Sequence, residues 1–152
     1  MRDGLFRYCS EEVVFQEVPG EVSLAYTMTG CPVGCKGCHS ADTWAVGTGL
    51  ELTLDYLAQQ LERYRGYITC LAFMGGEWRP GMLIAMLKLA QQEGVKTCLY
   101  SGYEEVDLAI RKHLDYLKTG PWKKALGGLD SPRTNQRFYD LRSETLLNVK
   151  FQ

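Results

Sequence analysis

The chain has 152 residues, of which 45% are hydrophobic and 23% are charged. These proportions are those of a globular protein and exclude a disordered or fibrous chain, and the length is that of one ordinary domain. There are 17 Lys and Arg against 18 Asp and Glu. A balance of this kind argues against nucleic acid or an anionic membrane as the main partner, since both select a basic surface.

The longest apolar stretch, about Ile68–Met74, is too short to span a bilayer. The first residues lack the apolar core of a secretory signal peptide. From these two observations we expect a cytoplasmic protein.

Strand and helix signals alternate along the first half of the chain. Val22–Met28 reads as a strand that stops at Gly30. A helix capped by Thr53 follows and ends near Gly66. The apolar run Tyr67–Met74 has the length and composition of a strand that is buried on both faces.

The second half repeats this alternation. A helix follows Pro80 and stops before Gly94, and Val95–Tyr100 is the next strand. A shorter and weaker helix is expected over Tyr103–His113, followed by a strand over Leu114–Lys118. Alternating strands and helices predict a single compact α/β domain over residues 1–152 with a mostly parallel sheet.

The four predicted strands end in similar small residues. Their carboxyl ends carry Thr29-Gly30, Gly75-Gly76, Ser101-Gly102 and Thr119-Gly120. In a parallel sheet these ends lie on one edge, where open α/β folds and barrels bind their ligands. Glycine also makes ordinary tight turns, but four such turns on one edge favour a binding site there.

Three of the six cysteines lie within eight residues, in the loop 30–39 directly after the first predicted strand. Cys31, Cys35 and Cys38 have the spacing C-x3-C-x2-C, which indicates metal or redox chemistry in a protein without a secretory signal. The other three, Cys9, Cys70 and Cys98, are scattered, and we expect them to be buried apolar side chains.

The spacing alone leaves several kinds of site open. A structural zinc ion needs a fourth ligand, which His39 or the distant Cys9 would have to supply. A redox dithiol normally has no third cysteine partner. A [4Fe–4S] cluster held by three cysteines keeps one iron open, and an open metal position is a place for substrate.

The cysteine loop resembles that of the radical S-adenosylmethionine enzymes. Four further segments resemble one family within them, the activating proteins of anaerobic (class III) ribonucleotide reductase: Phe73–Glu77, Tyr100–Tyr103, Leu117–Pro121 and Ser131–Arg137. The resemblance covers almost the whole chain. It implies an open, partial (β/α) barrel, a [4Fe–4S] cluster and S-adenosylmethionine as cofactors.

The resemblance also implies roles for particular residues. Three irons of the cluster would be held by Cys31, Cys35 and Cys38. S-adenosylmethionine would be bound by Gly37, Cys38, His39, Gly75, Gly76, Glu77, Ser101 and Lys118. In this interpretation Gly75-Gly76-Glu77 receives the methionine amino group, because glycines let the backbone approach closely. The cofactors carry the chemistry, so no further catalytic side chain is expected.

The implied activity is the generation of a glycyl radical on the anaerobic ribonucleoside-triphosphate reductase, with an electron from an external one-electron reductant. A chain of this size leaves the site open to a segment of a protein substrate. Two alternatives remain: activation of another glycyl-radical enzyme, of the pyruvate formate-lyase type, and a non-catalytic zinc or iron–sulfur module. Two positions depart from the family pattern: Glu21 lies where an Arg-containing stretch is usual, and Trp78 where a Pro is common.

Charge is unevenly distributed along the chain. From Arg111 onward there are nine basic and four acidic residues, so the remainder of the chain is acidic. We therefore expect a partner-docking segment at about 120–152, with Lys123 and Lys124 contributing to it through electrostatic steering.

Overall fold

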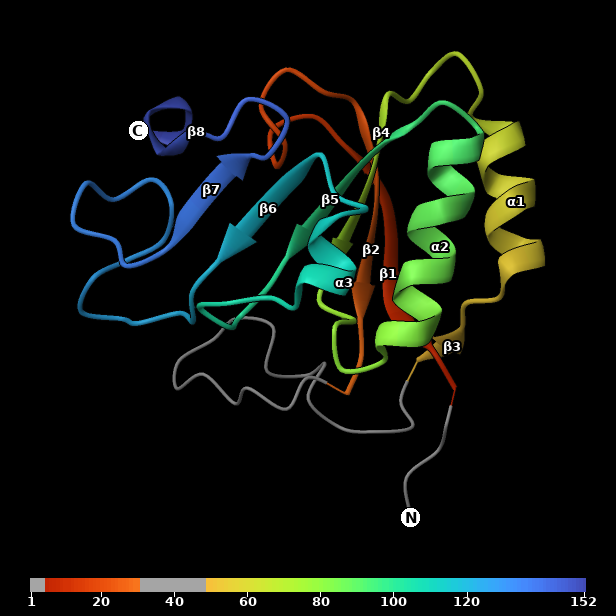
Figure 1. Ribbon diagram of the computed structural model, residues 1–152, viewed down its shortest axis with the longest axis horizontal. Helices are drawn as coiled ribbons and strands as arrows, with labels where there is room; N and C mark the ends of the chain where they lie inside the picture. Colours follow the sequence, from red (N-terminus) through yellow and green to blue (C-terminus); the bar gives the residue numbers. More distant parts are fainter. Residues whose placement is uncertain (1–4, 31–48) are drawn as a thin grey trace.

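The computed structural model describes residues 5–30 and 49–152 (Figure 1). These residues form one eight-stranded sheet in the order β3-β1-β2-β4-β5-β6-β7-β8. The strands are β1 (Arg7–Val14), β2 (Ser23–Met28), β3 (Leu50–Glu51), β4 (Cys70–Met74), β5 (Lys96–Tyr100), β6 (Tyr116–Thr119), β7 (Arg137–Asp140) and β8 (Thr145–Leu146). The helices are α1 (Leu54–Arg63), α2 (Pro80–Gln92), α3 (Leu108–Arg111) and a terminal 3-10 turn, η2 (Asn148–Phe151).

The sheet is mixed, so the expectation of a mostly parallel sheet is wrong. Only the central strands β2, β4, β5 and β6 are parallel. The outer pairings, of β1 with β2 and β3 and of β7 with β6 and β8, are antiparallel. β3 and β8 are the two edges of the described sheet, and the expected partial barrel is not confirmed. The α/β class is confirmed, and the four predicted strands are its parallel centre.

The two long helices follow from the residues that predicted them. Thr53 caps α1, because its hydroxyl accepts a hydrogen bond from the Tyr56 N–H (3.1 Å). Leu57 and Leu61 form the buried face of α1. Pro80 occupies the first turn of α2, where its missing N–H costs no hydrogen bond.

The third helix is much shorter than expected. The sequence predicts a helix over Tyr103–His113, whereas α3 contains only Leu108–Arg111. The backbone of Tyr103 has other partners: its N–H donates to the Ser101 hydroxyl (3.1 Å), and its carbonyl accepts from the Gly120 N–H (2.7 Å). These tertiary hydrogen bonds hold the start of the predicted helix against the ends of β5 and β6.

The helices cover one face of the sheet, and irregular chain covers the other (Figure 1). The helical face forms the larger core, which includes Phe73 of β4 and Leu87 of α2. On the opposite face, Cys70, Ala72 and Cys98 of the central strands pack in one cluster with residues of the flanking loops and of the carboxyl-terminal segment, namely Val18, Leu129 and Phe138. In the described residues, no helix is long and apolar enough to cross a membrane.

The strand β1 gave no clear strand signal because it carries charged residues. Its Glu11 accepts hydrogen bonds from two tyrosine hydroxyls, those of Tyr26 on β2 (2.7 Å) and Tyr56 on α1 (3.0 Å). Glu11 is thus a carboxylate at a position where a strand pattern would have an apolar residue. Its two hydrogen bonds link β1 to β2 and to α1.

Candidate functional site

The carboxyl ends of the parallel strands lie side by side, as the sequence predicts. The register aligns Thr27, Met74, Tyr100 and Lys118 across β2, β4, β5 and β6. Two backbone hydrogen bonds extend this alignment past the strand ends. The Gly75 N–H donates to the Tyr100 carbonyl (2.9 Å), and the Ser101 N–H donates to the Lys118 carbonyl (2.8 Å). The predicted positions on β4, β5 and β6 therefore share one edge.

Gly75 and Gly76 form the turn after β4, and both have a backbone conformation that favours glycine. Their φ angles are +91° and +108°. A Cβ added to Gly75 would lie 2.5 Å from the Trp78 ring, whereas one added to Gly76 would lie 3.1 Å from Phe6. The position that a side chain would occupy on Gly76 therefore faces the core. The fold itself requires glycine here.

Glu77 is the most unusual side chain at this edge. Both oxygens of its carboxylate are buried, and neither has a hydrogen-bond partner of ordinary geometry among the residues that the structure describes. Burial raises the pKa of Glu77 to about 7, while the backbone, the Ser101 side chain and the positive charge of Lys118 act to lower it. A buried carboxylate lowers the stability of the folded protein unless a hydrogen-bond donor or a cation lies beside it. Glu77 therefore fits a ligand that brings a positively charged donor.

Lys118 is buried at the end of β6. Its ammonium group donates hydrogen bonds to the Gly120 carbonyl (2.7 Å) and to the Ser101 carbonyl (3.2 Å). These bonds fix the positive charge close to the turns that follow β5 and β6. Because Lys118 also lowers the pKa of Glu77, the structure brings together three of the predicted residues, Glu77, Ser101 and Lys118.

Asn135 and Gln136, which come later in the chain than Lys123 and Lys124, also belong to this edge. The Asn135 side chain donates to the Pro121 carbonyl (3.0 Å), and the Gln136 side chain donates to the Gly120 carbonyl (3.4 Å). A Cβ on Gly120 would lie 3.2 Å from the Asn135 carbonyl oxygen. The sequence signal for this pair was the resemblance of Ser131–Arg137 to a family motif, which assigned it no role.

The predicted cluster ligands lie outside the described residues. Cys31, Cys35 and Cys38 belong to the segment 31–48, as do Gly37 and His39, so their roles stay predictions. Gly30, the last described residue before them, has a φ angle of +87° and lies two residues after the end of β2. The cysteine loop therefore begins at the same edge as Gly75, Ser101 and Lys118.

The remaining cysteines are Cys9, Cys70 and Cys98. Cys70 and Cys98 are buried in the sheet, as expected, and burial raises the pKa of both thiols. The expectation for Cys9 is wrong, because this residue is exposed on β1. Within residues 5–30 and 49–152, no group of three His, Cys, Asp or Glu side chains is placed to hold a metal ion.

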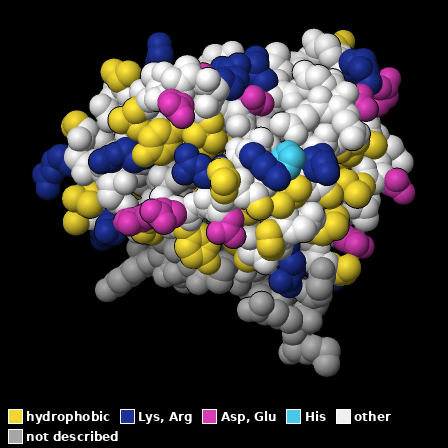
Figure 2. Space-filling model, viewed as in Figure 1, with side chains coloured by type: hydrophobic (Ala, Val, Ile, Leu, Met, Phe, Trp, Pro, Cys, Tyr) yellow, Lys and Arg dark blue, Asp and Glu magenta, His cyan; other side chains and the backbone are white. Residues whose placement is uncertain are grey.

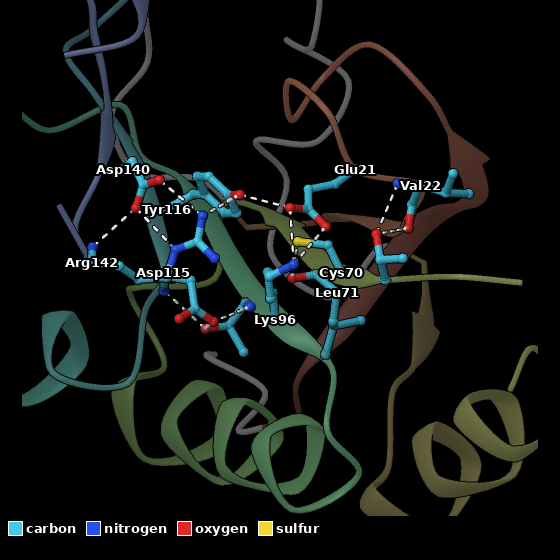
Figure 3. A network of polar contacts seen from close by, with 11 residues as sticks. Glu21, Val22, Cys70, Leu71, Lys96, Asp115, Tyr116, Asp140 and Arg142 are labelled. Carbon is cyan, nitrogen blue, oxygen red and sulfur yellow. Dashed lines mark hydrogen bonds and ion pairs between the residues drawn. The ribbon is translucent and has the colours of Figure 1, made fainter. Parts of the chain in front are cut away.

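Glu21, one of the two departures from the family pattern, lies just before the amino end of β2 and belongs to the network of polar contacts in Figure 3. Its buried carboxylate accepts a hydrogen bond from the Tyr116 hydroxyl (2.7 Å) and forms an ion pair with Lys96 (3.2 Å). The Tyr116 hydroxyl in turn accepts from Arg142 (2.8 Å), which pairs with Asp140. This network joins the starts of β5 and β6 to the chain beyond β7, which is a structural role.

Trp78, the other departure, lies at the predicted edge. Its indole N–H donates to the carbonyl of Thr29 (3.1 Å), and its ring lies against Gly75. Trp78 thus connects the glycine turn after β4 to the end of β2, immediately before the cysteine loop.

The fold and the site define an α/β protein with a buried acidic group and a buried cation at the carboxyl edge of its parallel strands. The sequence family described as "4Fe-4S single cluster domain" matches residues 18–126, well over half of the chain. The chain belongs to this family, and its metal cofactor is a single [4Fe–4S] cluster, as the resemblance of the cysteine loop implied.

Several curated proteins are similar to this chain. The pyruvate formate-lyase-activating enzyme of Clostridium pasteurianum is 37% identical over 98 residues, which are 57% of this chain and 40% of that protein. The corresponding enzyme of Listeria monocytogenes is 30% identical over 80 residues, 49% of this chain and 32% of its own length. The pyruvate formate-lyase 1-activating enzyme of Escherichia coli K12 is 29% identical over 76 residues, 46% of this chain and 31% of its length.

The chain thus matches 40% or less of the length of each of these relatives. The family and the relatives together support both expected cofactors, a [4Fe–4S] cluster and S-adenosylmethionine. They support an activating enzyme more directly than a non-catalytic module. The narrower resemblance to activators of ribonucleotide reductase is not confirmed by them.

Proposed function

We propose that the protein is a radical S-adenosylmethionine enzyme that activates a glycyl-radical enzyme. When bound, the cluster and S-adenosylmethionine supply a one-electron cleavage of a sulfur–carbon bond, with methionine and, once a glycine Cα–H hydrogen atom has been taken up, 5′-deoxyadenosine as products. The electron comes from an external one-electron reductant. The protein's own contribution is to bind, orient and shield the reacting groups.

The observation that carries this proposal is the buried carboxylate of Glu77. Neither of its oxygens has a hydrogen-bond partner of ordinary geometry among the described residues. It lies on the turn to which the family resemblance assigns the methionine amino group. An ammonium group at this position would donate to the carboxylate and neutralise its charge. Binding would then lower the pKa of Glu77 from about 7, since a nearby cation favours the ionised carboxylate.

The other described residues have compatible roles. The positive φ angles of Gly75 and Gly76 turn the chain sharply after β4, in a conformation that glycine adopts without strain. Ser101 and Lys118 would face the ribose or the carboxylate of the same ligand. Outside the described segment, Cys31, Cys35 and Cys38 would hold three irons, and Gly37, Cys38 and His39 would lie against the adenine.

The relatives favour pyruvate formate-lyase, or a similar glycyl-radical enzyme, as the protein substrate. The anaerobic ribonucleoside-triphosphate reductase is the second candidate. It is favoured by the segments Tyr100–Tyr103, Leu117–Pro121 and Ser131–Arg137, which resemble the activators of that enzyme.

A direct experiment separates the two substrates. The protein is reconstituted with iron and sulfide without oxygen, reduced, and incubated with S-adenosylmethionine and either pyruvate formate-lyase or the anaerobic reductase. Electron paramagnetic resonance then detects a glycyl radical on the protein that is the substrate. The proposal predicts a radical on one of them, and the absence of radical on both would contradict it.

A further inference from the structure

Two loops of opposite charge flank the candidate site. The acidic loop, residues 102–107 between β5 and α3, carries three exposed acids and no base: Glu104, Glu105 and Asp107. The basic loop, residues 121–136 between β6 and β7, carries three exposed bases, Lys123, Lys124 and Arg133, against the single acid Asp130. Figure 2 shows acidic and basic side chains close together on the face that it presents.

The two loops are held together at the site itself. The Gly120 N–H donates to the Tyr103 carbonyl (2.7 Å), so the first residue after β6 is bonded to the acidic loop. The Gly120 carbonyl accepts from Lys118, the predicted ligand-binding lysine (2.7 Å). The position of both loops is therefore fixed relative to the candidate cofactor site.

The basic loop is an ordered structure. The side chain of Asn135 closes its base by donating to Pro121, and the Thr134 hydroxyl donates across it to the Gly127 carbonyl (3.0 Å). Arg137, the first residue of β7, donates from its guanidinium to the Thr134 carbonyl (2.9 Å). A loop whose backbone is held in this way loses less conformational entropy when a partner binds.

The charges of the basic loop are available to a partner. Lys123, Lys124 and Arg133 are exposed, and they form no ion pair with any residue in the described part of the chain. The acidic loop also carries Tyr103, an aromatic residue that is 40% exposed and whose carbonyl is bonded to Gly120, next to the basic loop. A partly exposed aromatic side chain with charged residues around it is a common arrangement at the centre of a protein interface.

We propose that the basic loop receives an acidic segment of the protein substrate, and that the acidic loop repels this segment and so restricts it to one side of the site. The charges of the two loops identify the segment that binds. A basic surface beside an acidic one selects a segment whose acidic residues lie over Lys123, Lys124 and Arg133. This inference rests on the proposed function, because it names the surface on which the activated protein docks. Like charges placed opposite each other disfavour the reverse orientation.

The experiment uses charge reversal on each loop. Glycyl-radical formation is measured on pyruvate formate-lyase and on the anaerobic reductase, at low and at high salt, with the unmodified protein and with the double variant K123E/K124E. We expect the double variant to lower the rate about tenfold at low salt and less at high salt, because screening acts over about 10 Å. Formation of 5′-deoxyadenosine without a protein substrate, in which excess reductant supplies a second electron and solvent a proton in place of the glycine hydrogen atom, is expected to be unchanged.

Two further double variants serve as controls. E104K/E105K removes the repulsion by the acidic loop and is expected to strengthen binding of the protein substrate at low salt. Its effect on the rate of glycyl-radical formation is therefore expected to be opposite to that of K123E/K124E. R111E/K112E changes the same number of positive charges at the end of α3, outside the two loops, and is expected to have little effect. Thermal unfolding of each variant shows that its fold is retained.

Each outcome decides the proposal. A rate on the protein substrate that is unaffected by K123E/K124E, or a loss that is equal in R111E/K112E, overturns the docking surface alone. An equal loss of 5′-deoxyadenosine formation in K123E/K124E also overturns it, because the lysines would then support the cofactor site. If the unmodified protein forms no radical on either enzyme, the proposed function fails, and the docking surface fails with it.

Discussion

The indole N–H of Trp78 donates a hydrogen bond to the main-chain carbonyl of Thr29, with 3.1 Å between nitrogen and oxygen. This bond joins the turn after β4 to the end of β2, two residues before Cys31. The turn that carries Glu77 and the start of the cysteine loop are therefore positioned together. In the sequence Trp78 was only a departure from a family pattern, whereas in the structure it connects the two halves of the candidate site.

We expect the substitution Trp78→Phe to weaken this connection. It removes the hydrogen-bond donor and leaves the Thr29 carbonyl without that partner, which costs about 1–2 kcal/mol of unfolding free energy. Urea unfolding of the cluster-free protein measures this cost, and the rate of iron release measures the effect on the cysteine loop. Tyr67→Phe, an exposed aromatic change before β4, is the matched control. Iron release at the unmodified rate would show that Trp78 does not position the loop.

The buried carboxylate of Glu77 predicts a dependence of stability on pH in the ligand-free protein. Burial raises its pKa in the folded state to about 7, above the value near 4.5 of an exposed glutamate. Between these values the folded protein holds a proton that the unfolded chain has lost, so stability falls as the pH rises through this range. The whole effect is about 3 kcal/mol, since each pKa unit corresponds to about 1.4 kcal/mol.

Glu77→Gln removes this pH-dependent loss. We expect the variant to be more stable than the unmodified protein at pH 8 and similar to it at pH 5, where Glu77 is already protonated. The same substitution should weaken S-adenosylmethionine binding, because a neutral amide attracts an ammonium group less than a carboxylate does. Unfolding curves at the two pH values and equilibrium dialysis measure these effects. A variant that binds the cofactor as tightly as the unmodified protein would remove Glu77 from the site.

Glu21 predicts the opposite pH dependence at the other end of the sheet. Burial acts to raise its pKa, but hydrogen bonds from Thr69, Tyr116 and Lys96 outweigh burial and lower it. The stability that Glu21 contributes is present at neutral pH and is lost as the pH falls through its lowered pKa. We expect Glu21→Gln to cost about 1–2 kcal/mol at pH 7, because Lys96 is partly exposed and solvent weakens the pair.

The distance of Glu21 from the candidate site gives this prediction a second readout. Formation of 5′-deoxyadenosine should be unchanged in Glu21→Gln, and Glu12→Gln on the exposed part of β1 is the control for the loss of one acid. A loss of cofactor cleavage in a folded Glu21→Gln protein would show that the amino end of the sheet influences the site.

The centre of the fold could be predicted because its signals are local. The strand β4 is an almost uninterrupted apolar run, and α1 combines a Thr53 cap with a regular apolar face. The antiparallel strands β1 and β7 could not be predicted in the same way. Glu11 on β1 is stabilised by hydroxyl groups from β2 and α1, 15 and 45 residues away, and β7 pairs with β6 across the loop 121–136. These partners are distant in sequence, and no short pattern reveals them.

The candidate site shows the same division. Strand ends that carry Gly75, Ser101 and Lys118 could be placed on one edge, because parallel strands align their carboxyl ends. The sequence did not show that Lys118 bonds to Gly120, or that Gly76 is turned toward Phe6 instead of an open space. Side-chain direction depends on the turn conformations, which only the folded chain defines.

The most direct measurement of the central claim is the formation of 5′-deoxyadenosine. The protein is reconstituted with iron and sulfide and supplied with S-adenosylmethionine and excess one-electron reductant, which together with a solvent proton completes 5′-deoxyadenosine when no glycine is present. The products are separated by chromatography. We expect 5′-deoxyadenosine from the unmodified protein and from Cys98→Ala, whose thiol is buried in β5, but not from Cys35→Ser, because an alkoxide is a poor ligand for an iron–sulfur cluster. No product from the cluster-loaded unmodified protein, or undiminished product from Cys35→Ser, would contradict the account.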